Sequence, residues 1–74
     1  MSYDYSKLKG RIIEKYNTNR NFAQNMNISE RSLSLKLNNK VQWTQNEILV
    51  AAKLLGIKEN EIPIYFFKVI VQIN

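Results

Sequence analysis

The residues best suited to specific recognition in this chain lie between Ser29 and Asn38, in a segment with helical spacing. Two leucines one turn apart, Leu33 and Leu37, predict the side that faces a core. At about 100° per residue, the opposite side is small and polar and carries one cation. It holds Arg31, Leu35 and Asn38, with Ser32 and Ser34 at its flanks. Such a face can approach the base edges of a nucleic acid closely, whereas a leucine beside an arginine is less expected on a plain solvated surface.

A second helix and a turn are needed to position this face. Three apolar residues lie on one side of a predicted helix that starts at Thr18, whose hydroxyl can cap the free backbone amides. Asn27 follows where the chain must turn sharply, and asparagine tolerates the left-handed region better than any residue but glycine. Ser29 is a good N-cap for a helix that runs to about Asn38. Residues 18–40 therefore predict a helix-turn-helix.

The positive charge of the chain is concentrated in the half that contains this motif. Residues 7–40 hold eight lysines and arginines and two glutamates, so they carry +6, while the whole chain carries +5. This placement favours a polyanionic partner. Ordinary solubilising charge is the alternative, because a net charge of this size is common on a small domain.

Length and composition exclude several classes of function. Residues 1–74 are enough for a single domain, and the chain has no cysteine and no histidine. Common nucleophile–base pairs and thiolate or imidazole metal sites are therefore excluded, and we expect no catalytic residue, no metal and no cofactor. The longest apolar stretch, residues 62–73, is interrupted by polar residues and is too short to span a bilayer. We expect a cytoplasmic protein without a membrane partner.

Two further helices are predicted to support the motif. The first begins at Asp4 or Ser6 and ends near Tyr16, with Gly10 in its middle. Close packing, close approach of another group to the backbone, or a tolerated imperfection would explain the glycine. Its apolar side holds Tyr5, Leu8, Ile12, Ile13 and Tyr16.

The second supporting helix has the clearest start signal in the chain. Thr44 to Glu47 has the form of a capping box, and Trp43 can pack onto Ile48 as a hydrophobic staple. Gly56 ends this helix. We expect Trp43 to be structural, not a platform for stacking bases.

The C-terminal tail, residues 63–74, has the composition of a strand. A short helix before it is predicted to end at Pro63. Because we find no second strand in the chain, we expect residues 65–67 to pack on the helices and residues 68–73 to pair with the same segment of a second subunit.

The segments together resemble one family. They are the opening YDYSKLKGRI, the core FAQNMNISERSLSLKLNNK, the helix start W-T-x-x-E-I and the close I-P-x-Y-F-F. With these motifs the chain resembles the Cro/repressor class of helix-turn-helix regulators, and is most similar to small Cro-like or modulator-of-repression proteins of temperate phages of Gram-positive bacteria. The resemblance implies an all-α, lambda-repressor-like bundle of four to five helices, with room for a short C-terminal β-strand.

The resemblance also implies a DNA site. Helix 29–38 would enter the major groove. The base contacts would come from Glu30, Arg31, Ser34 and Leu35, and the phosphate contacts from Thr18, Asn19, Asn38, Asn39 and Lys40. Arginine can bond guanine bidentately, leucine can meet a thymine methyl, and glutamate can either accept from cytosine or favour the helix N-terminus. The family's usual glutamine at the head of the first motif helix is replaced by the shorter Asn19.

Two functions remain open from the sequence. The first is a phage-type transcriptional regulator that binds double-stranded operator DNA as a homodimer in a lytic/lysogenic switch. The second is an antirepressor that binds a phage repressor protein and has weak or no DNA binding of its own. Leu35 on the outer helix face and the apolar C-terminal tail suit the second function equally well.

Overall fold

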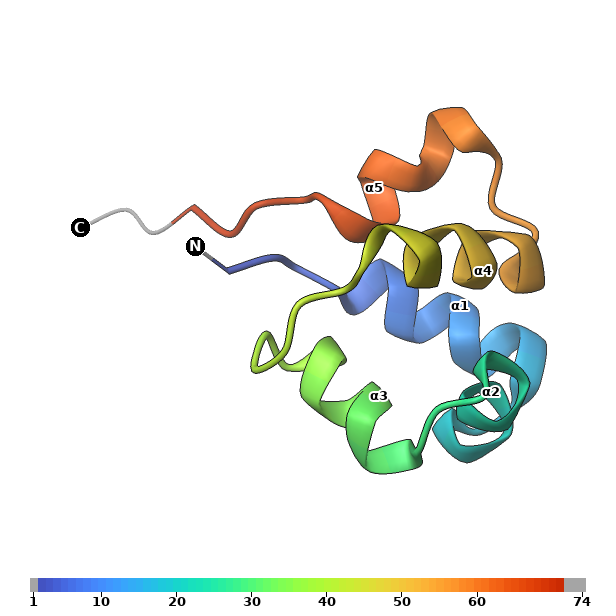
Figure 1. The fold of residues 1–74 in the computed structure, drawn as a ribbon. Helices are drawn as coiled ribbons and strands as arrows, with labels where there is room; N and C mark the ends of the chain where they lie inside the picture. The colour runs from blue at the N-terminus through green and yellow to red at the C-terminus, as the bar shows by residue number, and fades with distance from the viewer. Residues whose placement is uncertain (1, 72–74) are drawn as a thin grey trace.

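The computed structural model describes residues 2–71, which form an all-α fold (Figure 1). The elements are α1 (Ser6–Tyr16), α2 (Asn19–Met26), α3 (Glu30–Leu37), α4 (Gln45–Leu55), the 3-10 helix η1 (Glu59–Glu61) and α5 (Ile62–Phe66). Figure 1 shows α1 in the centre, with α2 and α3 on one side of it and α4 and α5 on the other. The four-to-five-helix fold class predicted from the sequence is confirmed.

The core fills the space where the helices meet around α1. Its largest fully buried side chains are Phe22, Phe66, Leu8, Ile12, Leu33 and Leu55. They come from α1 through α5, so each of these helices contributes a face to one apolar cluster. Burying such side chains stabilises the fold by roughly 1.5–3 kcal/mol each before the loss of conformational entropy is counted.

Local capping chemistry sets the ends of α2 and α3. The hydroxyl of Thr18 accepts a hydrogen bond from the backbone N–H of Asn21, and that of Ser29 accepts one from Ser32. Asn27 adopts the left-handed region with φ 61° and ends α2. The two short helices and the turn between them therefore lie where the sequence predicted them, because the signals act within a few residues.

The start and end of α4 also follow the sequence. Thr44 and Glu47 form the reciprocal capping box, and Gly56 closes the helix in the left-handed conformation with φ 66°. Trp43 packs against the core cluster that contains Ile48, as the staple predicts.

Pro63 does not end a helix, contrary to our prediction. It lies in the first turn of α5, directly after η1. The first turn has no intrahelical partner for a backbone N–H, so a proline there loses nothing and its fixed φ suits the helix. Residues 62–66 are therefore helical, and the strand predicted for residues 63–74 is wrong over this part.

The tail after α5 pairs within the chain. Tyr3 and Val69 form an antiparallel bridge, with backbone hydrogen bonds from Asp4 N to Lys68 O (2.7 Å) and from Ile70 N to Ser2 O (3.0 Å). The tail therefore finds a pairing partner within the chain, in residues 2–4, although the contact is a single bridge and neither segment is a strand. Residues 72 and 73, the end of the segment predicted to pair with a second subunit, lie outside the described residues.

Two predictions for α1 are settled by exposure. Ile13, placed on the apolar side by its spacing, is 49% exposed, because that side is wider than the part of the helix that the bundle covers. No atom lies within 4 Å of the position that a Cβ on Gly10 would take, apart from the helix's own backbone and the chain neighbours. Close packing does not explain this glycine.

Candidate functional site

The predicted base-contacting residues line one open depression on α3. Glu30, Arg31, Ser34 and Leu35 surround it together with Asn19 from the start of α2. Its volume is about 530 Å³. Arg31 is exposed and has no carboxylate within ion-pairing distance among the described residues. The structure thus brings these five side chains together, with one free guanidinium at the rim.

Leu35 is less exposed than the sequence predicted. It is half-buried and is the one apolar residue among those that line this depression. The chain after α3 folds back over the end of the helix, where Lys40 N and Val41 N both donate to Leu35 O. The depression therefore combines one apolar side chain with four polar or charged ones.

The predicted phosphate-contacting residues after α3 differ in whether their side chains are already hydrogen-bonded. Asn38 donates to Ser34 O and caps the end of α3. The side-chain amide of Asn39 is held by the N-terminal segment, because its Oδ1 accepts from Tyr3 N (2.8 Å) and its Nδ2 donates to Tyr3 O (2.9 Å). Lys40 is exposed. A phosphate contact from Asn39 would therefore use the second N–H of its Nδ2, because its backbone N–H donates to Lys36 O.

The N-terminal pair of predicted phosphate contacts is better placed. Asn19 is the first residue of α2 and lines the α3 depression, and Thr18 caps that helix through its oxygen. The hydroxyl proton of Thr18 remains a donor, and the first-turn backbone N–H groups that have no intrahelical acceptor project from the N-terminal end of α2. Whether these groups meet phosphate stays a prediction.

One lysine of the basic half does not face solvent. Lys36 is buried, its Nζ lies 2.9 Å from a carboxylate oxygen of Glu47, and it donates to Gln42 O at 3.2 Å. Burial raises the pKa of Glu47, but hydrogen bonds from Thr44 and Lys36 outweigh it, so the pKa lies below its ordinary value. This lysine ties α3 to the start of α4 and cannot contribute to a surface for polyanions.

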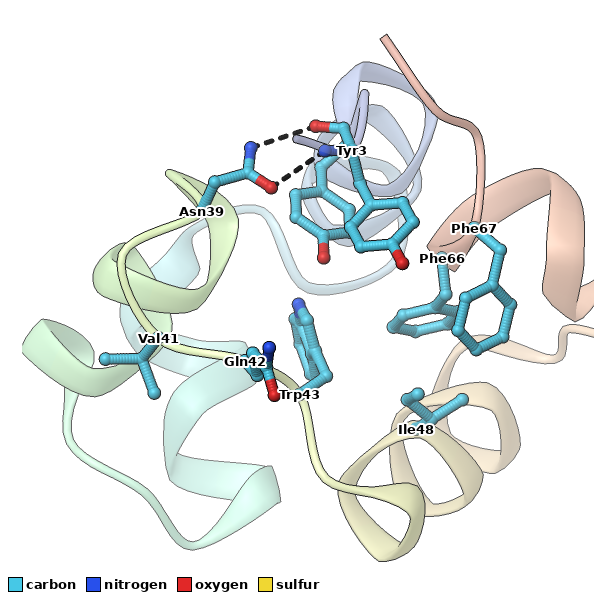
Figure 2. A pocket seen from close by; sticks show the side chains of 9 residues that line it. Tyr3, Asn39, Val41, Gln42, Trp43, Ile48, Phe66 and Phe67 are labelled. Carbon is cyan, nitrogen blue, oxygen red and sulfur yellow. Dashed lines mark hydrogen bonds between the residues drawn. The ribbon is translucent and has the colours of Figure 1, made fainter. Parts of the chain in front are cut away.

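A second hollow lies beside the Tyr3–Asn39 hydrogen bonds (Figure 2). Its volume is about 300 Å³, and aromatic rings form most of its wall. The lining residues are Tyr3, Tyr5, Asn39, Val41, Gln42, Trp43, Ile48, Phe66 and Phe67, which we call the aromatic pocket. They come from the N-terminal segment, the loop after α3, α4 and α5, so only the tertiary fold assembles them.

The rings of this pocket pack edge to face. Trp43 and Phe66 have ring centroids 5.1 Å apart at 81°, and Tyr3 and Phe67 have centroids 6.2 Å apart at 79°. Such arrangements contribute about 0.5–1.5 kcal/mol per pair beyond area burial. Asn39 holds the Tyr3 wall in place through its two hydrogen bonds, drawn as dashed lines in Figure 2.

Two polar groups of the aromatic pocket are poorly solvated. The indole N–H of Trp43 is buried and donates no hydrogen bond to any group in residues 2–71. Burial and the neighbouring Tyr3 raise the pKa of the Tyr5 hydroxyl. A buried donor without a partner is costly, by roughly 1–3 kcal/mol, so an acceptor that reached Trp43 would be held strongly.

Sequence reasoning missed this pocket. The only sequence feature that pointed to the pocket was the grouping of aromatic residues near the start of the chain, at positions 3 and 5, at position 43, and near its end, at positions 65–67. The staple explained the position of Trp43 but not its unpartnered N–H, because a hydrogen bond depends on which distant groups the fold brings near.

Other kinds of site find no support within the described residues. Residues 2–71 contain no cluster of three side chains that could hold a metal ion. In the same range, every helix is too short or too polar to cross a bilayer.

Comparisons with known proteins place the chain in a family. A search of curated proteins found no match. Among solved structures, the chain is similar to the modulator of repression (MOR) of the temperate bacteriophage TP901-1 from Lactococcus lactis, determined in solution. The two are 55% identical, with a TM-score of 0.79 over 93% of this chain and 96% of that chain. Residues 1–69 match a family model, and the chain belongs to the family described as "Protein of unknown function (DUF739)".

Proposed function

We propose that this protein is a phage modulator of repression, which regulates the choice between lytic and lysogenic programmes by binding a repressor protein. The 55% identity with the TP901-1 modulator of repression over 93% of the chain carries this proposal. The two chains share their fold, with a TM-score of 0.79. The protein would act in the cytoplasm of the bacterial host, as the sequence predicted.

The aromatic pocket is the surface that suits a protein partner best. Aromatic residues are enriched in the cores of protein interfaces, where they supply area at a low entropic cost. The N–H of Trp43 has no acceptor within residues 2–71, so it would gain a hydrogen bond if a carbonyl or carboxylate of the partner entered the pocket. Phe67, 48% exposed at the pocket wall, offers apolar surface beside it.

The test compares two single substitutions for binding to the repressor of the same phage. Trp43→Phe removes the indole N–H and keeps an aromatic ring, whereas Arg31→Ala changes only the α3 depression. We expect Trp43→Phe to weaken the complex by about 10-fold in calorimetric titration, the equivalent of one hydrogen bond of about 1.4 kcal/mol. Failure of the unmodified protein to bind any form of the repressor contradicts the proposal.

Operator binding by α3 is the second candidate function. It is supported by the depression that joins Glu30, Arg31, Ser34 and Leu35, the residues predicted to contact bases, with Asn19. If α3 enters a major groove, Arg31→Ala lowers operator affinity by roughly 1–3 kcal/mol and relaxes base preference. Lys40→Ala instead weakens all sequences alike and lowers the salt slope by about one unit.

Gel-shift titrations on the phage's regulatory intergenic DNA, with and without its repressor, separate the two functions. An antirepressor releases the repressor from DNA and forms no band of its own. A DNA-binding regulator shifts the operator alone. Equal losses on operator and random DNA for Arg31→Ala would count against base readout.

A homodimer through the C-terminal segment is also part of the proposal. Two copies on operator DNA would place their α3 helices about 34 Å apart. Residues 68–71, which follow α5 and remain exposed, are available for such an association.

A further inference from the structure

The bridge between residues 2–4 and residues 68–70, which we call the terminal ladder, joins two segments with different outer edges. In the ladder, Lys68 O and Ile70 N face the N-terminal segment, so the N–H and C=O of Tyr3 and of Val69 point outward on opposite sides. On the Tyr3 side, the side-chain amide of Asn39 bonds both outward groups. An asparagine amide has the same donor and acceptor as a peptide group, so this edge is closed.

The other edge is open. Within residues 2–71, the N–H and C=O of Val69 and of Val71 make no hydrogen bond. The side chains along this edge are exposed: Val69 by 41%, Ile70 by 47% and Val71 by 77%. Figure 1 shows the segment at the outside of the molecule, beyond the N-terminal segment. An apolar edge without a proline, bulge or covering element is a template for strand addition.

We propose that this open edge pairs with the same edge of a second copy, antiparallel, about a two-fold axis at Ile70. The inference rests on the homodimer in the proposed function and specifies its interface and register. Val69 of each copy then lies opposite Val71 of the other as a hydrogen-bonded pair, and the two Ile70 side chains meet as a non-hydrogen-bonded pair. The two terminal ladders become one four-stranded sheet.

The pattern of outward groups selects this register. Only odd-numbered residues present free groups, so hydrogen-bonded pairs must join Val69 and Val71 in some combination. An axis at Ile70 uses both residues of both copies and makes four hydrogen bonds. An axis at Val69 would place Val71 opposite Phe67, which is the C-cap of α5, and would make two.

Self-complementarity favours a second copy as the occupant. In a two-fold arrangement, each free N–H of one copy meets a free C=O of the same edge in the other copy. Apolar side chains then lie opposite apolar side chains. Lys68 is the only charged residue in 68–71, and an axis at Ile70 puts the two lysines at opposite ends of the paired segment. The register therefore avoids a like-charge contact.

The interface is small, so the association is weak. Four residues per copy bury far less than the roughly 1,200 Å² of a stable interface. We expect a dissociation constant on the order of 100 µM, with a monomer at low micromolar concentration.

Single cysteines test the register, because the chain has no cysteine of its own. We would compare Val69→Cys, Ile70→Cys and Val71→Cys at 200 µM protein in a glutathione redox buffer. The Cβ atoms of a non-hydrogen-bonded pair on one two-fold axis lie within disulfide range. We expect Ile70→Cys to form covalent dimers at least 10-fold faster than either neighbour. Equal rates, or a faster reaction at Val71, overturn the proposed register.

A proline variant tests the hydrogen bonds. Val69→Pro deletes an outward N–H in each copy and leaves the bonds of Lys68 O and Ile70 N intact, whereas Val69→Thr keeps the N–H and nearly the same shape. By sedimentation equilibrium we expect the proline variant to dimerise about 10-fold more weakly and the threonine variant within about twofold. Protection of the Ile70 amide from hydrogen exchange confirms that the ladder of the monomer is kept.

Two outcomes separate this inference from the proposed function. If the unmodified chain stays monomeric at 1 mM, the second copy is not the occupant and the inference is overturned, while repressor binding is measured independently. If Val69→Pro weakens repressor binding and not self-association, the edge serves the repressor instead, which also overturns it.

Discussion

The α3 depression and the aromatic pocket differ in how they are built. The depression takes four of its five residues from one helix, whose ends are capped by Ser29 and Asn38. The aromatic pocket takes its walls from four segments, and Phe66, one of these walls, is also among the most buried residues of the core. The depression can therefore vary in sequence without affecting the fold, whereas the pocket is tied to stability.

This difference bears on how the protein recognises partners. Polar residues on an exposed helix face can be substituted with little loss of folding stability, so the specificity of a DNA-binding protein can change through them. A pocket made by core residues is preorganised, which suits a conserved contact with one protein partner. Lys36 connects the two regions, because it lies on α3 and its Nζ contacts Glu47 and Gln42 beside the pocket.

The largest expected effect tests the claim that the pocket is part of the core. Phe66→Ala should lower the free energy of unfolding by about 3–5 kcal/mol, since Phe66 is 1% exposed and leaves a cavity against Trp43. The neighbouring Phe67→Ala should lower it by less than about 1 kcal/mol, and Arg31→Ala by no more than about 0.5 kcal/mol. Urea denaturation measures all three, and similar values for Phe66 and Arg31 would remove the contrast.

Lys36 tests the link between the two regions. Lys36→Met keeps the aliphatic stem but leaves Glu47 without its cation, and it should lower the free energy of unfolding by about 2 kcal/mol. This is less than for a fully buried pair, because Glu47 is partly exposed. Lys40→Met, at an exposed position, is the matched control and should change stability by less than about 0.5 kcal/mol. Thermal unfolding that shifts equally for both variants contradicts the link.

The two glycines test positions outside both regions. Gly10→Ala should raise the free energy of unfolding by about 1 kcal/mol, because the site is open and helical. Gly56→Ala should lower it by roughly 1–2 kcal/mol, because φ there is 66°. Repressor binding should be unchanged for Gly10→Ala. A loss of binding with this variant would show that α1 carries a third contact surface.

The smallest effect concerns pH. The pKa of Glu47 is lower in the folded protein than in the unfolded chain. Ionised Glu47 therefore contributes fully to stability when the pH is above its pKa in the unfolded chain, and this contribution disappears as the pH falls through its pKa in the folded protein. Between about pH 5 and pH 3, the unfolding free energy should therefore fall more steeply for the unmodified protein than for Glu47→Gln. Glutamine keeps the capping box without the charge, and parallel curves would exclude this role for Glu47.

The candidate residues on α3 could be predicted because their arrangement depends on a single helix. The spacing of Leu33 and Leu37 fixed which side faces the core, and Arg31 and Ser34 are exposed as a consequence. The partial burial of Leu35 could not be predicted, because the exposure of a side chain depends on which distant segments pack beside it. The pocket could not be predicted either, because its walls are up to 64 residues apart in the chain, from Tyr3 to Phe67.

Local sequence signals determined where α2, α3 and α4 begin and where α2 and α4 end. Thr18, Ser29 and Thr44 cap the third residue that follows each of them, and Asn27 and Gly56 each end a helix with their own backbone. These interactions span a few residues, so the chain needs no distant partner to specify them.

The tertiary structure alone decided the roles of residues whose partners are remote. Asn39 bonds Tyr3 across 36 positions, Lys36 bonds Glu47 instead of meeting solvent, and the tail pairs with residues 2–4 at the opposite end of the chain. The physical reason is that a hydrogen bond or ion pair requires two groups within a few ångströms. Only the packing of the helices around α1 brings these groups together.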